Sequence, residues 1–162
     1  MKISLAVFLL ILGVAPAFGQ VQELEARAGG VTCGTCFNAA LLSLKRLPGV
    51  ADVTGAAREG WIRVSVDAKK GISIRQAMDR VRVAGLKDDM QCSIKASGTL
   101  EKRGGRLVLV VPHQKELFVV DSGDRERMAM NAAAAGERVV ATGWMSGSGN
   151  QYDVMVTKLQ KP

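Results

Sequence analysis

The chain has 162 residues, of which 48% are hydrophobic and only 4% aromatic, and its formal net charge is +7. This length allows one or two small domains whose cores consist mainly of aliphatic side chains. The basic residues are scattered in runs no longer than two, unlike the clustered charge of a nucleic-acid binder, so we expect no nucleic-acid partner. A single histidine leaves little material for acid–base catalysis, and we expect a protein that is not an enzyme.

Residues 1–19 have the pattern of a secretory signal peptide. Lys2 is followed by an apolar run over residues 3–14 and then by small residues, with a cleavage position after Ala17 or Gly19. The run is shorter than the about 20 apolar residues that a membrane-spanning helix needs. We therefore expect a periplasmic or secreted protein with no membrane span in the mature chain.

Residues 20–96 alternate between strand and helix patterns. The expected strands cover residues 24–28, 50–57, 62–66 and 90–96. Apolar side chains at helical spacing predict helices over residues 37–47 and 74–81, the second with Ser73 as its N-cap. The order strand, helix, strand, strand, helix, strand predicts a ferredoxin-like βαββαβ domain, in which two helices cover one face of an antiparallel sheet.

Residues 97–162 form short β-rich runs separated by glycines. The expected strands cover residues 98–101, 106–111, 116–120, 137–142 and 152–158, with one helix at about 125–135. Five strands with a helix after the third predict a small OB-like β-barrel. The predicted fold class is therefore α+β: a ferredoxin-like βαββαβ domain over residues 20–96, followed by a small OB-like β-barrel domain over residues 97–162.

Two cysteines, Cys33 and Cys36, lie at the predicted start of the first helix, in the sequence "GGVTCGTCFNAALLSL" of residues 29–44. Residues three apart lie on the same face of a helix, so both sulfur atoms can converge at its N-terminus. The helix dipole and the free backbone N–H groups there favour thiolates. Two convergent thiolates form a soft site of low coordination number, which suits Cu(I) or Hg(II) better than Zn(II) with its usual four ligands.

The sequence "GVTCGTC" before the first helix resembles the GMTCxxC loop of heavy-metal-associated domains, which occur in copper chaperones, metal-transporting P-type ATPases and periplasmic mercuric-ion-binding proteins. The resemblance covers about residues 24–96 and includes "LPGV" at 47–50 and "AGL" at 84–86. It implies that Cys33 and Cys36 are metal ligands. The expected ion is one Cu(I), with Hg(II) or another soft metal as the alternative. The implied function is metal trafficking or sequestration, with exchange to or from a donor or acceptor protein.

Two positions depart from the family pattern. Val31 stands where the motif usually has Met, a buried anchor of the loop that is not a ligand. Leu86 stands where the family has Lys, Tyr or Phe after the second helix, a position that tunes the site. The metal preference of the family therefore does not carry over to this chain.

Other interpretations of the cysteines stay open. In an exported protein, Cys33 and Cys36 can form a structural disulfide in an interaction module. They can also serve thiol–disulfide exchange, although the aromatic residue before the first cysteine and the proline between the pair, typical of such enzymes, are missing. Cys92 alternates in phase with Met90 and Ile94, so we expect it in the core, with a role as third ligand as the alternative.

In some periplasmic copper-binding proteins, a histidine, two methionines and a tryptophan of an OB-type barrel hold Cu(I). The second half of this chain contains residues of these types: His113, Met128, Met130, Trp144, Met145 and Met155. No tryptophan directly precedes the Met128-Ala-Met130 pair, and the expected helix contains both methionines. Residues 97–160 resemble, more weakly, small bacterial OB-like barrels, through "GRLVLV" and "GERVVATGWM". We expect packing and surface roles for these residues.

Overall fold

The computed structural model describes residues 20–67, 69–122, 136–148 and 150–162. The expected signal peptide and the expected helix at 125–135 lie outside the described residues. The elements are β1 (Gln20–Arg27), α1 (Gly34–Lys45), β2 (Val50–Ala56), β3 (Trp61–Val66), α2 (Ile74–Arg82), β4 (Gln91–Arg103), β5 (Arg106–Val110), β6 (Leu117–Ser122), β7 (Arg138–Ser148) and β8 (Gln151–Gln160). The strands form one sheet in the order β2-β3-β1-β4-β5-β6-β8-β7, and a further pairing of β4 with β7 closes five of them into a barrel.

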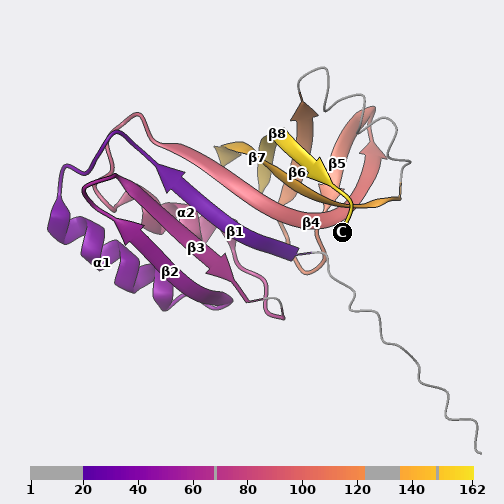
Figure 1. Ribbon diagram of the computed structural model, residues 1–162. Helices are drawn as coiled ribbons and strands as arrows, with labels where there is room; N and C mark the ends of the chain where they lie inside the picture. Colours follow the sequence, from indigo (N-terminus) through magenta and orange to yellow (C-terminus); the bar gives the residue numbers. More distant parts are fainter. Residues whose placement is uncertain (1–19, 68, 123–135, 149) are drawn as a thin grey trace, which may run out of the picture.

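The predicted fold class, a ferredoxin-like domain followed by an OB-like barrel, is wrong. The protein is mostly β, with a closed five-stranded barrel, three further strands and two short helices in the described part of the chain. Strand β4 belongs to both halves, because residues 91–97 pair with β1 on one edge while residues 92–99 pair with β7 on the other. Figure 1 shows β4 running without a break from the helix-bearing end into the barrel.

Gly98 explains why the sequence suggested a separation at this point. A glycine between two apolar runs was expected to end one strand and begin another, yet Gly98 lies inside β4. A Cβ atom at this position would lie 2.4 Å from the carbonyl oxygen of Val110 on the paired strand β5. The glycine is therefore required by the close approach of two backbones rather than by a turn.

Gly143 has the same role in β7. The strand was expected to end at Thr142, but it continues to Ser148 and shifts its register against β8 between Thr142 and Gly143. A Cβ atom at Gly143 would lie 2.4 Å from the carbonyl oxygen of Met155 on β8. A glycine at an irregularity of this kind lets a strand bend around a barrel.

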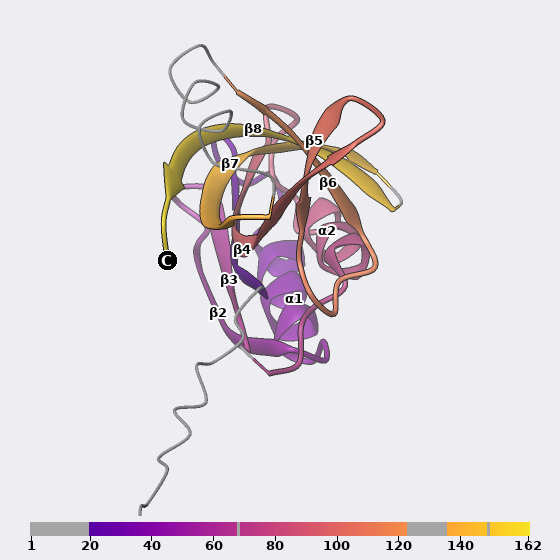
Figure 2. The ribbon, with the colours of Figure 1, turned by 90° about the vertical axis from the view of Figure 1, so that its right-hand side faces the viewer.

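The two helices cover one face of the sheet and lie side by side (Figure 2). Helix α1 buries Phe37, Ala40 and Leu44, spaced along one face, and α2 buries a stripe that begins at Ile74 and ends at Val81. The N-caps are Cys33 for α1 and, as expected, Ser73 for α2. One continuous hydrophobic cluster contains these helix residues together with side chains of the barrel strands, so both halves share a core.

Candidate thiol site

The loop between β1 and α1 brings Cys33 and Cys36 together. Cys33 is the N-cap of α1, and its sulfur accepts a hydrogen bond from the backbone N–H of Cys36 at 3.2 Å. The two sulfurs are joined in a disulfide, with 5.3 Å between the Cα atoms. Both side chains are partly exposed. The convergence expected from the CxxC spacing is therefore present, with the pair in its oxidised form.

The segment after α2 holds the start of this loop in place. The backbone N–H and the hydroxyl of Thr32 both donate to the carbonyl oxygen of Gly85, at 2.7 and 2.9 Å. The backbone N–H of Lys87 donates to the carbonyl oxygen of Gly30 at 3.1 Å. These bonds connect residues more than 50 positions apart in sequence, so they tie the cysteine loop to the end of the second helix.

Val31 and Leu86, which flank the cysteine loop and the turn after α2, lie opposite each other. They form an isolated antiparallel bridge, and both pack against the hydrophobic core while partly buried. An aliphatic pair here supplies apolar contact between the cysteine loop and the segment after α2. The two side chains are therefore neighbours in space and help to anchor the cysteine loop.

Gly85 directly faces Cys33. Its φ angle is +68°, in the left-handed region that favours glycine, and a Cβ atom there would lie 2.9 Å from the Cβ of Cys33. A side chain at this position would press against the first cysteine. The glycine of the "AGL" segment is thus needed both for the turn after α2 and for the fit of the cysteine loop.

Two further contacts hold the residues that lead from β1 into the loop. The backbone N–H of Gly29 donates to both carboxylate oxygens of Asp89, at 2.9 and 3.0 Å. The backbone N–H of Ala28 donates to the carbonyl oxygen of Gly60, at 2.8 Å. Sequence reasoning missed both anchors, since they join distant segments and neither residue stands in a recognisable pattern.

The position of both cysteines at the N-terminus of α1 favours thiolates once the disulfide is reduced. The first turn of α1 contains no acidic residue, so the positive end of its dipole is not neutralised from within the helix. The ammonium of Lys87 lies beside Gly30, 3.5 Å from the position that a Cβ there would take, and the carboxylate of Asp89 lies beside Gly29, so one charge of each sign borders the loop. The hydroxyl of Thr35 lies 3.6 Å from the sulfur of Cys33, within hydrogen-bonding range of sulfur.

Cys92 lies apart from this pair. It is a free cysteine, 8% exposed, in β4 beneath α2, where it lines a small cavity with Ala77, Met78 and Val81. Burial raises the pKa of its thiol to about 11, although the nearby charge of Arg82 acts in the opposite direction. The expectation that Cys92 faces the core is confirmed.

The other candidate ligands are dispersed among the described residues. His113 is exposed in the turn between β5 and β6, with a positive φ of 63°. Trp144 and Met155, 45% and 57% exposed, lie opposite each other on β7 and β8, and Met145 is buried. Met128 and Met130 lie outside the described residues. Within the described part of the chain, no three His, Cys, Asp or Glu side chains group around a metal position.

Comparisons of the chain with protein-family models, with curated proteins and with solved structures gave no match. None of the described helices has the length and apolar character needed to cross a membrane. The functional interpretation therefore depends on the motif and on the geometry of the cysteine loop.

Proposed function

We propose that the chain is an exported soft-metal-binding protein in which reduced Cys33 and Cys36 bind one metal ion. The observation that carries the proposal is the convergence of the two sulfurs at the N-terminus of α1, in a partly exposed loop. The cargo is Cu(I) in the first place, with Hg(II) as the alternative, because two thiolates provide a soft site of low coordination number.

The disulfide corresponds to the metal-free, oxidised form of this site. Binding requires that an external reductant first supply two electrons and two protons to the Cys33–Cys36 bond. Both thiols then lose their protons to solvent when the metal binds. The N-terminal amides of α1 stabilise the resulting thiolates.

Partial exposure of both cysteines suits transfer of the metal. An incoming thiolate from a donor or acceptor protein can reach a two-coordinate ion and form a three-coordinate intermediate before one of the original ligands leaves. The anchored backbone at Thr32 and Gly29 keeps the loop in place during this exchange. The chain would therefore act in trafficking or sequestration rather than in catalysis.

A second candidate function is thiol–disulfide exchange, which the Cys33–Cys36 disulfide itself favours. A helix N-terminus that stabilises a thiolate also makes a cysteine a good leaving group. The two functions differ in a measurable way, since a redox protein reduces or isomerises a model disulfide at catalytic rates and a metal carrier does not.

The test is a titration of the reduced chain with Cu(I), Hg(II) and Zn(II) against a competing chelator. We expect tight binding of Cu(I) and Hg(II), weak binding of Zn(II), and loss of one equivalent of bound metal in Cys33→Ser, Cys36→Ser. Gly34→Ala, which changes the residue between the two cysteines where an added Cβ would have nothing within 4 Å, serves as the matched control. Unchanged metal binding in the double variant, or turnover of a model disulfide by the wild type, would contradict the proposal.

A further inference from the structure

A groove between α2 and the barrel gathers most of the sulfur-bearing side chains of the described residues. Its volume is about 400 Å³. Its lining includes Met78, Arg82, Met90, Cys92, Trp144 and Met145. None of these residues belongs to the cysteine loop at the start of α1, so the groove is separate from the proposed thiol site.

Cys92 and Met145 are directly opposite each other on the paired strands β4 and β7. Side chains at such positions project from the same face of a sheet, with Cβ atoms roughly 4.5–5.5 Å apart. On the other edge of β4, Cys92 faces the small side chain of Ala26, which leaves space beside the thiol. The register therefore places one thiol and one thioether side by side at the base of the groove.

The remaining two methionines close around this pair. Met78 of α2 lines the groove and also shares with Cys92 the small cavity beneath the helix, so it lies over the thiol. Met90 directly precedes β4, two residues before Cys92, and alternation along an extended chain places it on the same face. One thiol and three thioethers thus line one space, and its lining also includes Trp144, which is 45% exposed.

The chemistry of this lining selects a monovalent soft metal. Thiolate and thioether sulfurs are the ligands that Cu(I) prefers, whereas hard cations require oxygen. The Cys92 thiolate carries one negative charge, so a bound Cu(I) ion would form a neutral pair with it in this largely apolar space. A divalent ion would leave an uncompensated positive charge close to Arg82, which also lines the groove.

We propose that Cys92, Met78, Met145 and Met90 form a second Cu(I) site in the groove between α2 and the barrel. On binding, the thiol of Cys92 releases its proton to solvent, and its sulfur and the thioether sulfurs take up the metal without any change in oxidation state. This proposal does not depend on the function of Cys33 and Cys36.

The test uses the chain with Cys33→Ser and Cys36→Ser, which removes the first site. Cu(I) is added under reducing conditions against a chromophoric Cu(I) chelator. We expect one equivalent to bind, and Met78→Leu with Met145→Leu to weaken its affinity by more than about tenfold, the effect that even outer-shell changes can have. Leucine nearly conserves the volume of methionine, so these variants keep a packed core.

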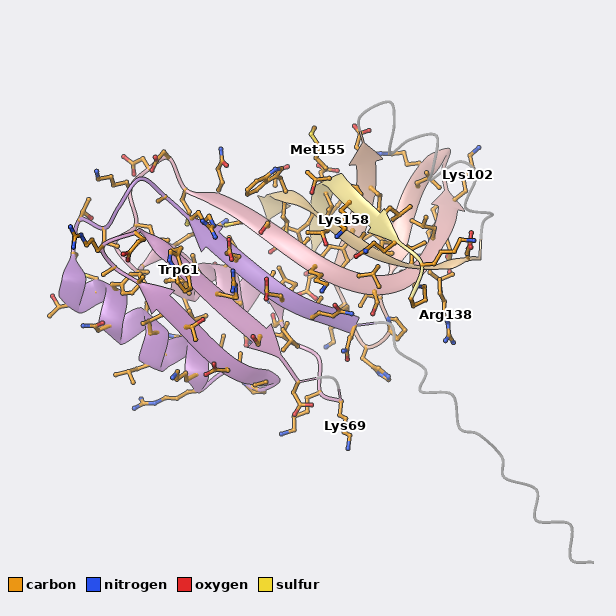
Figure 3. The ribbon with its side chains drawn as sticks, in the orientation of Figure 1. Trp61, Lys69, Lys102, Arg138, Met155 and Lys158 are labelled. Carbon is orange, nitrogen blue, oxygen red and sulfur yellow. A yellow bond between two sulfur atoms is a disulfide. The ribbon has the colours of Figure 1, made fainter. Side chains whose placement is uncertain are left out.

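The matched control is Met155→Leu, which removes an exposed methionine of the same barrel. Figure 3 shows Met155 projecting outward from β8, and it does not line the groove, so its replacement should leave Cu(I) affinity unchanged.

A second readout uses Trp61→Phe, after which Trp144 is the single tryptophan of the chain. Its fluorescence should then decrease with Cu(I) and reach a plateau at one equivalent.

Two results would overturn the proposal. One is the absence of Cu(I) binding in the Cys33→Ser, Cys36→Ser background while the circular dichroism spectrum remains that of the wild type. The other is binding that persists with unchanged affinity in the Met78→Leu, Met145→Leu variant and in a separate Cys92→Ala variant. Neither result affects the proposal for Cys33 and Cys36. That proposal is tested by the equivalent of bound metal that is lost when those two thiols are replaced.

Discussion

The chain places its three cysteines in two contrasting environments. Cys33 and Cys36 lie in a partly exposed loop at the N-terminus of a helix, where the backbone N–H of Cys36 donates to the sulfur of Cys33. Cys92 lies in the shared strand β4, where burial raises the pKa of its thiol to about 11 despite the charge of Arg82. The comparison shows that the same side chain lies partly exposed at a helix N-terminus in one place and buried among apolar side chains in the other.

The largest effect is expected from Gly85→Ala, which acts on the exposed pair alone. The new Cβ would lie 2.9 Å from that of Cys33 at a positive φ, so we expect the free energy of unfolding to fall by about 3 kcal/mol. Chemical denaturation measures this loss. Gly104→Ala is the control, because Gly104 also has a positive φ but nothing lies within 4 Å, and it should cost only about 1–2 kcal/mol. Equal costs for the two variants would show that Gly85 has no special contact with the cysteine loop.

Cys92→Ser acts on the buried side of the comparison. A hydroxyl replaces the thiol in an apolar space beneath α2, and we expect a loss of about 2 kcal/mol in the free energy of unfolding. Under reducing conditions, Cys33→Ser with Cys36→Ser should change the same quantity by less than about 0.5 kcal/mol, as is usual for surface substitutions. A larger loss of stability in the Cys33→Ser, Cys36→Ser variant than in Cys92→Ser would contradict the distinction between an exposed and a buried environment.

Asp89→Ala tests the anchoring of the exposed loop. It removes the acceptor of the backbone N–H of Gly29, and we expect a loss of about 1 kcal/mol in the free energy of unfolding. Hydrogen exchange at Gly29 should become faster. Asp88→Ala removes the same charge while leaving these bonds in place, so faster exchange in both variants would point to charge rather than to the hydrogen bonds.

The smallest effect concerns Glu25, on the strand between the two environments. Burial raises the pKa of its carboxyl, but hydrogen bonds from Arg27 and Arg63 outweigh burial and lower the pKa below 4.5. Its contribution to stability is therefore complete above about pH 4.5 and is lost as the pH falls through the lower folded-state pKa. The stability difference between wild type and Glu25→Gln, below about 1 kcal/mol, should shrink over that range in urea titrations. A constant difference would mean that this carboxylate gains nothing from its arginines.

The local elements could be predicted from the sequence because their periodicity is strong. Alternation identified β3, helical spacing identified the buried faces of α1 and α2, and the phase of Cys92 placed it in the core. The CxxC spacing also placed both sulfurs at the start of α1. These properties depend on neighbours within a few residues, which a single sequence displays directly.

The prediction of the fold class was wrong because a glycine can either form a turn or allow two paired strands to approach closely. Gly98 and Gly143 suggested turns, but each allows a close approach between paired strands inside a continuous strand. Strand β4 therefore runs unbroken through Gly98 and is shared by the two halves. The anchors of the cysteine loop at Gly60 and Asp89 were missed for a related reason, since contacts across the fold leave no local pattern.

The most direct test of the proposed thiol site measures the alkylation of each cysteine by mass spectrometry. The reduced chain is treated with iodoacetamide without metal and with saturating Cu(I), and peptides containing each cysteine are quantified. We predict fast labelling of Cys33 and Cys36 without metal, strong protection of both by Cu(I), and slow labelling of Cys92 in either condition. Labelling of Cys33 and Cys36 that Cu(I) leaves unchanged would contradict the claim that this pair binds a soft metal.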